Sequence, residues 1–354
     1  MNYIGENNYF SFRDGGCEEK NGREISAEQA IFLGKILSGI FSRFSIGCSG
    51  FENLPLIYSL SSSISECGKD VYICENTDFP SFRFGCPLIS SDCGIYARNN
   101  KITFCDRNGF IFSDIRLTEI MNGRPAKKSV KYGRISSFTS FRDIYINNIA
   151  DTLNVSTAIP AGISCGDRSV RSLWLEFFTG DDDDFVFQIS DDGNRVNAYS
   201  TEYGFIPYEK LMLCFCVLNN KNSDNTVYLP WDMHYSADYA ENINVKRFDY
   251  DDMPPQAVKQ RFLKDSLYMC THIAENRYLL GSIIKKLPSF ASARRDIVSD
   301  FPEKNAGRTI ESENGRIIVG RSGKNRISLT AQAYSSETAA ELCAEWSEKL
   351  MHNN

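Results

Sequence analysis

The chain has 354 residues, of which 42% are hydrophobic and 24% are charged, a balance typical of a globular protein of about two to four domains. Its formal net charge of −6 argues against a dedicated nucleic-acid binder. No stretch approaches the about 20 apolar residues of a membrane-spanning helix. The first residues also lack the basic start and apolar core of a signal peptide, so we expect a cytoplasmic protein with no membrane partner.

The first part of the chain alternates predicted helices and strands. Ser26 and Gln29 have the spacing of a capping box and predict a helix over 26–41. The elements predicted next are a strand over 44–47, a helix over 54–67 closed by Gly68, a strand over 71–74, a helix or turn over 80–87, and short strands over 94–97 and 101–104. This alternation predicts an α/β layer.

Residues 122–142 contain six basic residues and no acidic one. A solvated connection between domains is the interpretation that this pattern favours, and a site for a polyanion is the alternative.

The second part of the chain continues the alternation. The predicted elements are helices over 143–153, 168–178, 208–218 and 337–350, a long helix over 258–287, and strands over 158–163, 185–189, 226–229, 315–320 and 326–333. The last strands and helix predict a small α+β domain.

Cysteine and histidine residues do not form a metal-binding pattern. The chain has 12 cysteines and 3 histidines, with no Cys-x-x-Cys pair. The closest pair, Cys214 and Cys216, lies in an apolar run, where cysteine behaves as a small hydrophobic residue. We therefore expect free thiols and no structural zinc.

The order of these segments resembles the α-D-phosphohexomutase superfamily, which contains phosphomannomutases, phosphoglucomutases and phosphoglucosamine mutases of carbohydrate metabolism. The positions that carry the resemblance early in the chain are Gly34 and residues 67–71, 94–95, 106–109 and 133–135. Residues 190–195, followed by 202–204, are similar to the family's metal loop, Asp-Gly-Asp-x-Asp-Arg. Residues 320–328, followed by 331–335, are similar to its phosphate loop, Arg-x-Ser-Gly-Thr-Glu-Pro.

The resemblance implies an α/β fold with three related units, the second compressed, and a small C-terminal α+β domain. The implied domains are 1–143, 144–205 with a degenerate metal loop, 206–297 without the family's sugar-reading Gly-Glu-x-Ser-Gly loop, and 298–354 with the phosphate loop. The family's Asp-x-Arg phosphate sensor after the first strand is replaced here by Gly-Cys-Ser-Gly at 47–50.

The family's catalytic serine has no counterpart in this sequence. Members carry a phosphoserine, in a Thr-Ala-Ser-His-Asn-Pro loop, that donates phosphate to a hexose phosphate. At the matching place this chain has Arg98 and Asn99, and neither side chain can carry a transferable phosphoryl group as a serine ester does. Thr103 is a nearby hydroxyl, but the pattern places it inside the next strand, so a displaced nucleophile is the weaker alternative.

The metal loop is reduced in the same way. Its three aligned positions are Ser190, Asp192 and Asn194, which leave one carboxylate of three. Mg²⁺ requires hard, preferably anionic oxygens, and Asp191 could compensate only in part. Because Asp, Gly and Asn favour turns, we expect a plain turn without bound metal. The four aspartates at 181–184 lack calcium-loop spacing and are expected to form a solvated loop.

The C-terminal loop is the best preserved element of the family pattern. Its members Arg321, Ser322, Gly323, Lys324 and Arg326 combine cations, a hydroxyl and backbone N–H groups in one turn. Such a turn can bind phosphate, sulfate or a hexose phosphate. A hairpin turn with ordinary surface charges is the equally weighted alternative.

We therefore expect a non-catalytic phosphohexomutase homologue without a cofactor. Its expected ligand is inorganic phosphate or a sugar phosphate, and it would act as a regulatory or scaffolding partner of another protein or of a second copy. One alternative is an active phosphosugar mutase or phosphatase with a displaced nucleophile and a weak magnesium site. A second alternative is an α/β protein unrelated to the family.

Overall fold

The structure is a computed structural model that describes residues 10–13, 15–19, 24–99, 101–219, 226–240, 243–287, 291–298, 308–323 and 326–352. The chain divides into two compact units. Unit 1 contains Met1–Ala158, Ile163–Thr179 and Ile189–Asn194, and unit 2 contains Ile159–Gly162, Gly180–Gln188 and Arg195–Asn354. No helix in the described ranges is long and apolar enough to cross a membrane.

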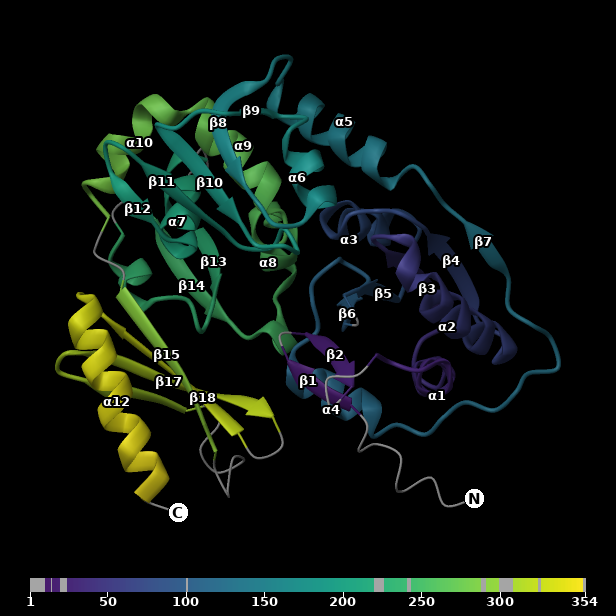
Figure 1. Cartoon of the computed structure of the whole chain (residues 1–354). Coiled ribbons are helices and arrows are strands. Elements are labelled where there is room, and N and C mark those ends of the chain that lie inside the picture. Colours follow the sequence, from purple (N-terminus) through teal and green to yellow (C-terminus); the bar gives the residue numbers. More distant parts are fainter. Residues whose placement is uncertain are drawn as a thin grey trace. The chain divides into compact units, whose positions relative to one another are not determined.

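A seven-stranded mixed sheet forms the centre of unit 1, with the order β1-β2-β6-β5-β3-β4-β7 (Figure 1). Its strands are β1 (Phe10–Arg13), β2 (Gly16–Glu19), β3 (Arg43–Cys48), β4 (Asp70–Cys74), β5 (Cys93–Arg98), β6 (Lys101–Asp106) and β7 (Ile135–Ser137). Strands β5, β3, β4 and β7 are parallel to one another, whereas β6, β2 and β1 are joined by antiparallel pairing. The predicted α/β layer is confirmed.

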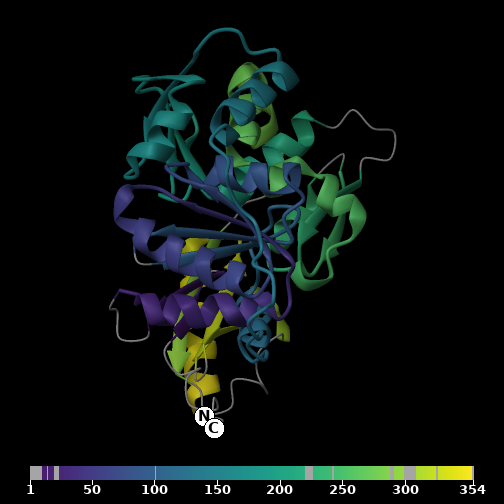
Figure 2. The same ribbon diagram turned by 90° about the vertical axis from the view of Figure 1, so that its right-hand side faces the viewer.

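Helices cover both faces of this sheet (Figures 1 and 2). The helices are α1 (Ala27–Ser38), α2 (Leu54–Glu66), α3 (Phe79–Leu88), α4 (Asp114–Met121) and α5 (Phe141–Leu153). Side chains of α1, α2 and α4 pack with Ile46, Ile73 and Ile95 in one apolar core. Side chains of α3 and α5 pack with Cys74, Tyr96 and Cys105 in another. Because successive strand residues point to opposite faces, β4, β5 and β6 supply side chains to both cores.

Local sequence signals explain where the first helices begin and end. The Ser26 side chain accepts a hydrogen bond from the Gln29 N–H, and the Gln29 side chain accepts one from the Ser26 N–H, so the predicted capping box is confirmed. Gly68 follows α2 with φ of 77°, a conformation that glycine adopts without strain. It lets the chain turn directly into β4.

The basic stretch 122–142 belongs to unit 1. It runs past the ends of α1 and α2 and then forms β7, which pairs with β4 from Val71↔Ile135 to Ile73↔Ser137. The predicted solvated character agrees with the exposure of Lys127, Lys131 and Arg134, whereas the pairing of β7 with β4 was not predicted. The reason is that the segment's backbone groups find partners at the open edge of β4, which charge composition alone does not reveal.

A second sheet has five strands in the order β12-β11-β10-β8-β9. Its strands are β8 (Ile159–Ser164), β9 (Phe178–Gly180), β10 (Phe185–Ile189), β11 (Val196–Ser200) and β12 (Gly204–Ile206), and α6 (Arg168–Trp174) lies between β8 and β9 in the chain. The predicted strand over 185–189 is confirmed. The predicted helix over 168–178 ends earlier, at Trp174, and Phe178 already belongs to β9.

Unit 2 contains helices packed around Phe215 of α7 (Tyr208–Leu218), whose ring contacts Phe262, Tyr268 and His272. The single long helix predicted over 258–287 was wrong. The segment is divided into α8 (Pro255–Lys259), η5 (Arg261–Leu263), α9 (Ser266–Glu275) and α10 (Arg277–Ile284). Asp265 caps α9 by accepting from the Tyr268 N–H at 2.9 Å, and Asn276 donates to the His272 carbonyl at 2.8 Å. These side chains compete with helical hydrogen bonds and interrupt the helix.

Two smaller sheets complete unit 2. Strands β13 (Thr226–Pro230) and β14 (Asn244–Phe248) form a parallel pair. An antiparallel sheet with the order β15-β18-β17-β16 carries the C-terminal helix α12 (Ser336–His352). Its strands are β15 (Ala291–Val298), β16 (Arg308–Ser312), β17 (Gly315–Gly323) and β18 (Arg326–Ala333). Ala339, Leu342 and Cys343 of α12 pack on the apolar face of this sheet, so the predicted C-terminal α+β fold is confirmed.

Candidate functional site

The carboxyl ends of the parallel strands in unit 1 define the place where a site is expected. Strand β3 lies between β5 and β4. The chain continues from β3 to β4 on one side, and the following strand, β5, lies on the other side of β3. In open α/β sheets, ligands bind at this reversal of strand order, beyond the carboxyl ends of the strands. The residues at this position are Cys48 and Arg98, which end β3 and β5, and Ser49 and Asn99, which follow them.

Arg98 joins three loops through one guanidinium group. Its Nε lies 3.1 Å from Oδ2 of Asp167, and its Nη2 lies 3.3 Å from Oδ2 of Asp191. The Nε contact is an ion pair without hydrogen-bond alignment. The side chains of Arg98 and Asp167 are each only 15% exposed. Because Asp167 follows β8 and Asp191 follows β10, Arg98 ties the ends of β5, β8 and β10 together.

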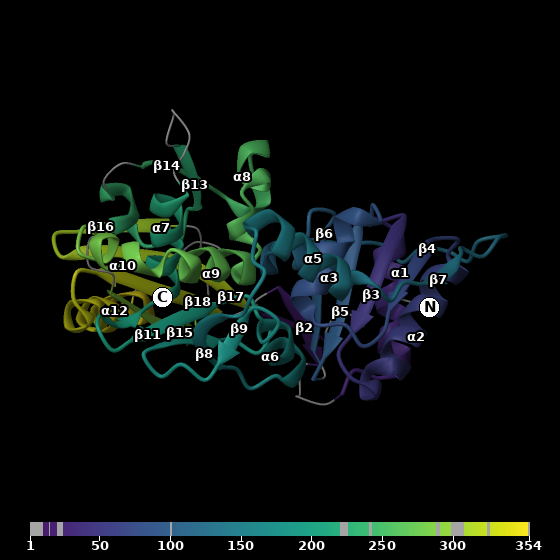
Figure 3. The ribbon, with the colours of Figure 1, turned by 90° about the horizontal axis from the view of Figure 1, so that it is seen from above.

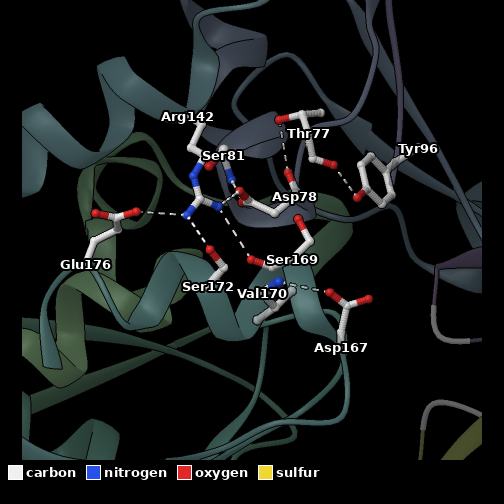
Figure 4. Close-up of polar contacts among 10 residues, drawn as sticks. All are labelled: Thr77, Asp78, Ser81, Tyr96, Arg142, Asp167, Ser169, Val170, Ser172 and Glu176. Carbon is white, nitrogen blue, oxygen red and sulfur yellow. Dashed lines mark hydrogen bonds and ion pairs between the residues drawn. The ribbon is translucent and has the colours of Figure 1, made fainter. Parts of the chain in front are cut away.

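Asp167 has a second role in the same place. It caps α6 by accepting a hydrogen bond from the Val170 N–H at 2.9 Å (Figure 4). Its position is therefore fixed by the helix, and Arg98 meets a carboxylate that is already oriented. Sequence reasoning missed Asp167 as a partner of Arg98, although an aspartate directly before a helix is a recognisable cap.

The degenerate metal loop is a hydrogen-bonded turn around Asp192. Oδ1 of Asp192 accepts from the Ser190 hydroxyl at 2.6 Å and from the Asn194 N–H at 3.0 Å, and Oδ2 accepts from Nδ2 of Asn194 at 2.6 Å. Gly193 has φ of 71°, which closes the turn. The structure thus brings Ser190, Asp192 and Asn194 together, and each is used to hold the turn.

Electrostatics around this turn favour the ionised carboxylate of Asp192. Burial opposes its ionisation, but the hydrogen bonds from Ser190 and Asn194 and the nearby Arg83 outweigh burial and lower the pKa of Asp192. Arg83 also donates from Nη1 to Oδ1 of Asn194 and from Nε to the Gly109 carbonyl. A guanidinium therefore lies on each side of the turn, with Arg98 at Asp191 and Arg83 at Asn194.

This donor set does not fit a magnesium site. Mg²⁺ prefers octahedral coordination by anionic oxygens and water. Here the Asp191 carboxylate is paired with Arg98, the Asp192 oxygens bind the turn itself, and two cations lie beside the loop. Within the described residues, no group of three or more His, Cys, Asp or Glu side chains is arranged to hold a metal ion.

The two candidate nucleophile positions differ in their surroundings. Asn99 begins the turn from β5 to β6 with φ of 46°, as short polar residues in turns often do. Thr103 lies within β6, paired with Tyr96 of β5, as the sequence predicted. Its hydroxyl is therefore fixed on a strand and is not part of the turn that carries Arg98.

Two carboxylates lie near Cys48 at the end of β3, Glu52 in the loop that follows β3 and Glu75 directly after β4. The Asn53 side chain holds this loop by donating to the Ser49 carbonyl at 2.9 Å and to the Glu52 carboxylate at 3.2 Å. Burial raises the pKa of the Cys48 thiol, and the nearby Glu75 and Glu52 raise it further. A negative environment of this kind disfavours a bound phosphate.

Arg142 of α5 connects the helices that position these loops (Figure 4). Its Nη1 donates to Asp78 Oδ2 at 3.2 Å, and the other acceptors of its guanidinium are the Ser169 carbonyl, the Ser172 hydroxyl and the Glu176 carboxylate. Asp78 is buried and caps α3 by accepting from the Ser81 N–H. Burial raises the pKa of Asp78, although the hydrogen bonds and Arg142 oppose this. Arg142 therefore ties α3, α5 and α6 into one framework.

The predicted phosphate loop is a β-hairpin connection. Arg321, Ser322 and Gly323 end β17, and Arg326 begins β18, with a register irregularity between Arg321 and Gly323. Lys324 lies outside the described residues, as do the side chains of the other four members of the loop. The binding role of this loop stays a prediction.

Comparisons with known proteins agree with this architecture. No family model and no curated protein matches the sequence. A solved phosphoglucomutase/phosphomannomutase family protein from Burkholderia thailandensis matches with a TM-score of 0.67 and 12% identity over 98% of this chain and 96% of that chain. The chain has the phosphohexomutase fold. The resemblance drawn from the order of the sequence motifs is therefore confirmed at the level of the fold.

Two further solved structures share this fold. An N-acetylglucosamine-phosphate mutase, a member of the α-D-phosphohexomutase superfamily solved in its product complex, matches with a TM-score of 0.51 and 11% identity over 96% of both chains. The N-acetylphosphoglucosamine mutase of Aspergillus fumigatus, solved with GlcNAc-6P and magnesium, matches with a TM-score of 0.52 and 11% identity over 86% of this chain and 76% of that chain.

Proposed function

We propose that this chain is a non-catalytic protein with the phosphohexomutase fold. The observation that carries the proposal is the position of Arg98, whose guanidinium lies between Asp167 and Asp191 at the carboxyl ends of β5, β8 and β10. Here an internal cation replaces both the nucleophile and the positive charge that a metal ion would supply. The protein keeps the fold and neutralises its acidic loops with its own side chains.

Phosphoryl transfer needs groups that this site does not combine. A nucleophile that can carry the phosphoryl group must face the substrate, with an acid–base group and cations that stabilise the transferred charge. The guanidinium of Arg98 forms no phosphoester. Thr103 is held within β6, and Asp192 holds the turn at Gly193.

We further propose that the protein binds phosphate or a hexose phosphate weakly at the hairpin that carries Arg321. Arginine can contact a phosphate with two parallel hydrogen bonds, and this hairpin contributes N–H groups as well. The binding of GlcNAc-6P by the mutase from Aspergillus fumigatus supports sugar phosphates as the ligand class. Without a closing lid, the expected affinity is about millimolar, or about −4 kcal/mol. A regulatory or scaffolding role beside an active mutase follows from binding without turnover.

Amide NMR can test the anion site directly. Titration with inorganic phosphate is expected to shift the signals of residues 320–326, and the Arg321→Ala variant is expected to lose these shifts. Sodium chloride at the same ionic strength is the control for a general salt effect. Unmoved signals at high phosphate would leave this segment as an ordinary hairpin turn.

A coupled mutase assay tests the absence of catalysis. With hexose 1-phosphates, Mg²⁺ and a bisphosphate activator, we expect no 6-phosphate product above the rate without enzyme. The competing function is an intramolecular phosphotransferase or a phosphatase with a displaced nucleophile, and the shared fold of the neighbouring mutases favours it. Turnover that disappears in the Thr103→Ala variant would establish that alternative and reject the non-catalytic proposal.

A further inference from the structure

A strongly basic segment crosses the surface of unit 1. Residues 122–137, called the basic strap from here on, run from the end of α4 to the end of β7 (Figures 1 and 3). The basic strap carries five cations and no carboxylate, so its net charge is +5. Since the whole chain has a net charge of −6, all other residues together carry −11. Blocks of like charge of this kind often take part in interactions with an oppositely charged partner.

The backbone of the basic strap is held in place. Hydrogen bonds join the Ala126 N–H to the Lys35 carbonyl at 2.8 Å, the Ser129 N–H to the Glu66 carbonyl at 2.9 Å, and the Gly133 N–H to the Ser65 carbonyl at 2.9 Å. Asp70 also accepts from the Arg134 N–H at 2.9 Å. The cations are therefore presented on an ordered surface, which lowers the entropy cost of binding a partner.

Among the described residues, most cations of the basic strap have no carboxylate partner. Lys128 pairs with Glu66 at 3.4 Å, and Glu66 is also approached by Lys35 at 3.7 Å. For the other four, no carboxylate of the described residues lies within ion-pair distance, and all four are exposed: Arg124, Lys127, Lys131 and Arg134. Their charge is available to an anionic partner.

Apolar side chains are interleaved with these cations. Val130 is fully exposed, and Tyr132 and Ile135 are 67% and 46% exposed. Single exposed apolar residues are common, but three within six positions form a continuous part of one segment. A partner that fits this surface must therefore offer apolar side chains as well as negative charge.

The outer edge of β7 is open. In the described part of the chain, β7 pairs with β4 and ends the sheet. The Arg134 carbonyl and the Phe138 N–H bind β4. By the alternation of strand hydrogen bonds, the N–H and C=O groups of Ile135 and Ser137 face away from β4. An extended peptide can pair with these groups and add a strand.

We propose that the basic strap and the outer edge of β7 form a docking surface for an acidic, extended protein segment that adds a strand beside β7. Positive side chains at a sheet edge repel a second copy of the same edge. The same charges attract a strand that alternates acidic and apolar residues. A protein segment is favoured over a nucleic acid because the rest of the chain is strongly negative and Val130, Tyr132 and Ile135 have no use in phosphate binding.

Fluorescence anisotropy with the full-length protein tests this surface. The probe is a fluorescein-labelled peptide of about 12 residues that alternates glutamate and valine, longer than a typical strand so that it can extend beyond β7 along the basic strap. It is expected to bind, with an affinity that falls at least about tenfold between about 0.05 M and about 0.5 M salt. The peptide with lysine in place of glutamate is expected not to bind.

Charge-reversal variants locate the binding site. The triple variant Lys127→Glu, Lys131→Glu, Arg134→Glu is expected to weaken binding at least about tenfold, since it reverses three exposed charges of the surface. The matched control is Lys259→Glu, Lys285→Glu, Lys286→Glu, which changes net charge equally at exposed positions elsewhere and is expected to change affinity less than about twofold. Equal weakening in both variants would overturn the proposal.

A proline substitution tests the strand pairing separately from charge. Ser137→Pro removes an N–H that faces away from β4, so the native sheet is expected to persist, as circular dichroism and the melting temperature will show. Peptide binding is expected to fall at least about fivefold, because the added strand loses a hydrogen bond and meets a steric obstacle. Unchanged binding in this variant, or tighter binding of a single-stranded oligonucleotide of equal length, would reject the docking of an acidic strand.

Discussion

The loops around Arg98 and the basic strap use positive charge in opposite ways. In these loops each cation contacts a side-chain oxygen. Arg98 forms ion pairs with Asp167 and Asp191, and Arg83 donates a hydrogen bond to Asn194. On the basic strap, Lys127 and Lys131 extend into solvent with no described carboxylate in reach. Paired charges in a partly buried site stabilise the fold, whereas unpaired charges on a held backbone contribute little to stability and can serve binding. The predictions below measure this difference.

Arg142→Ala is expected to have the largest effect on stability. It would leave Asp78 buried without its cation, and breaking such a pair costs about 3 kcal/mol. Urea unfolding at neutral pH measures the loss, and Arg142→Lys is the matched control because it keeps the charge but loses the fork of hydrogen bonds. A loss below about 0.5 kcal/mol would show that the framework of α3, α5 and α6 does not depend on this residue.

Arg98→Ala is expected to cost about 2 kcal/mol, since Asp167 and Asp191 would lose the cation between them. The informative measurement is the melting temperature with and without Mg²⁺. A divalent ion is expected to raise the melting temperature of Arg98→Ala and to leave that of the wild type unchanged, because the variant frees two carboxylates. Arg98→Lys is the control that keeps a cation. An equal response of variant and wild type would contradict the role of Arg98 as an internal cation.

Asp192→Asn is expected to cost about 1.5 kcal/mol near pH 7, because an amide cannot accept all three hydrogen bonds of the carboxylate. The pKa of Asp192 is lowered in the folded protein. Its contribution is therefore complete above the ordinary aspartate pKa of about 3.9 and is lost as the pH falls through the lower folded value. The stability difference between wild type and variant should be constant at higher pH and shrink in acid. A difference that grows in acid would refute this assignment.

Lys131→Ala is expected to have the smallest effect on stability, within about 0.5 kcal/mol, because the side chain is exposed and unpaired. Its affinity for the glutamate–valine peptide should nevertheless fall about twofold, as expected for one surface charge. A clear loss of stability would place Lys131 in the structure of unit 1 and remove the contrast with Arg98.

Much of the fold could be predicted because its signals are local. The capping box at Ser26 and the apolar run of α7 each lie within the element that they predict. The long helix predicted over 258–287 shows where local reasoning fails. Asp265 and Asn276 are compatible with a helix by propensity, but their side chains bind nearby backbone groups and interrupt it. Strand β7 was also missed, because its partner β4 lies more than 60 positions earlier in the chain.

The sequence predicted which positions belong to the candidate site, but it did not predict which of their side chains contact one another. The sequence indicated that Arg98 occupies the place of the family's serine. It also indicated that Asp192 is the one carboxylate left among the three aligned positions of the metal loop. It could not indicate that Arg98 meets Asp167, or that Arg83 meets Asn194 across 111 positions of sequence. Such pairs form between segments that are far apart in the sequence, and no local sequence pattern predicts which of these segments contact one another.

The pairing of Arg98 has a consequence for how the sequence can change over time. Exchanging Arg98 for serine would introduce a hydroxyl but leave two carboxylates without a counter-charge, so the first step toward a phosphorylatable site lowers stability. A serine becomes tolerable only when a neighbouring acid is exchanged as well or a bound cation replaces the guanidinium. Substitutions at 98, 167 and 191 are therefore epistatic, and a phosphorylatable side chain at position 98 requires coordinated changes, not a single exchange.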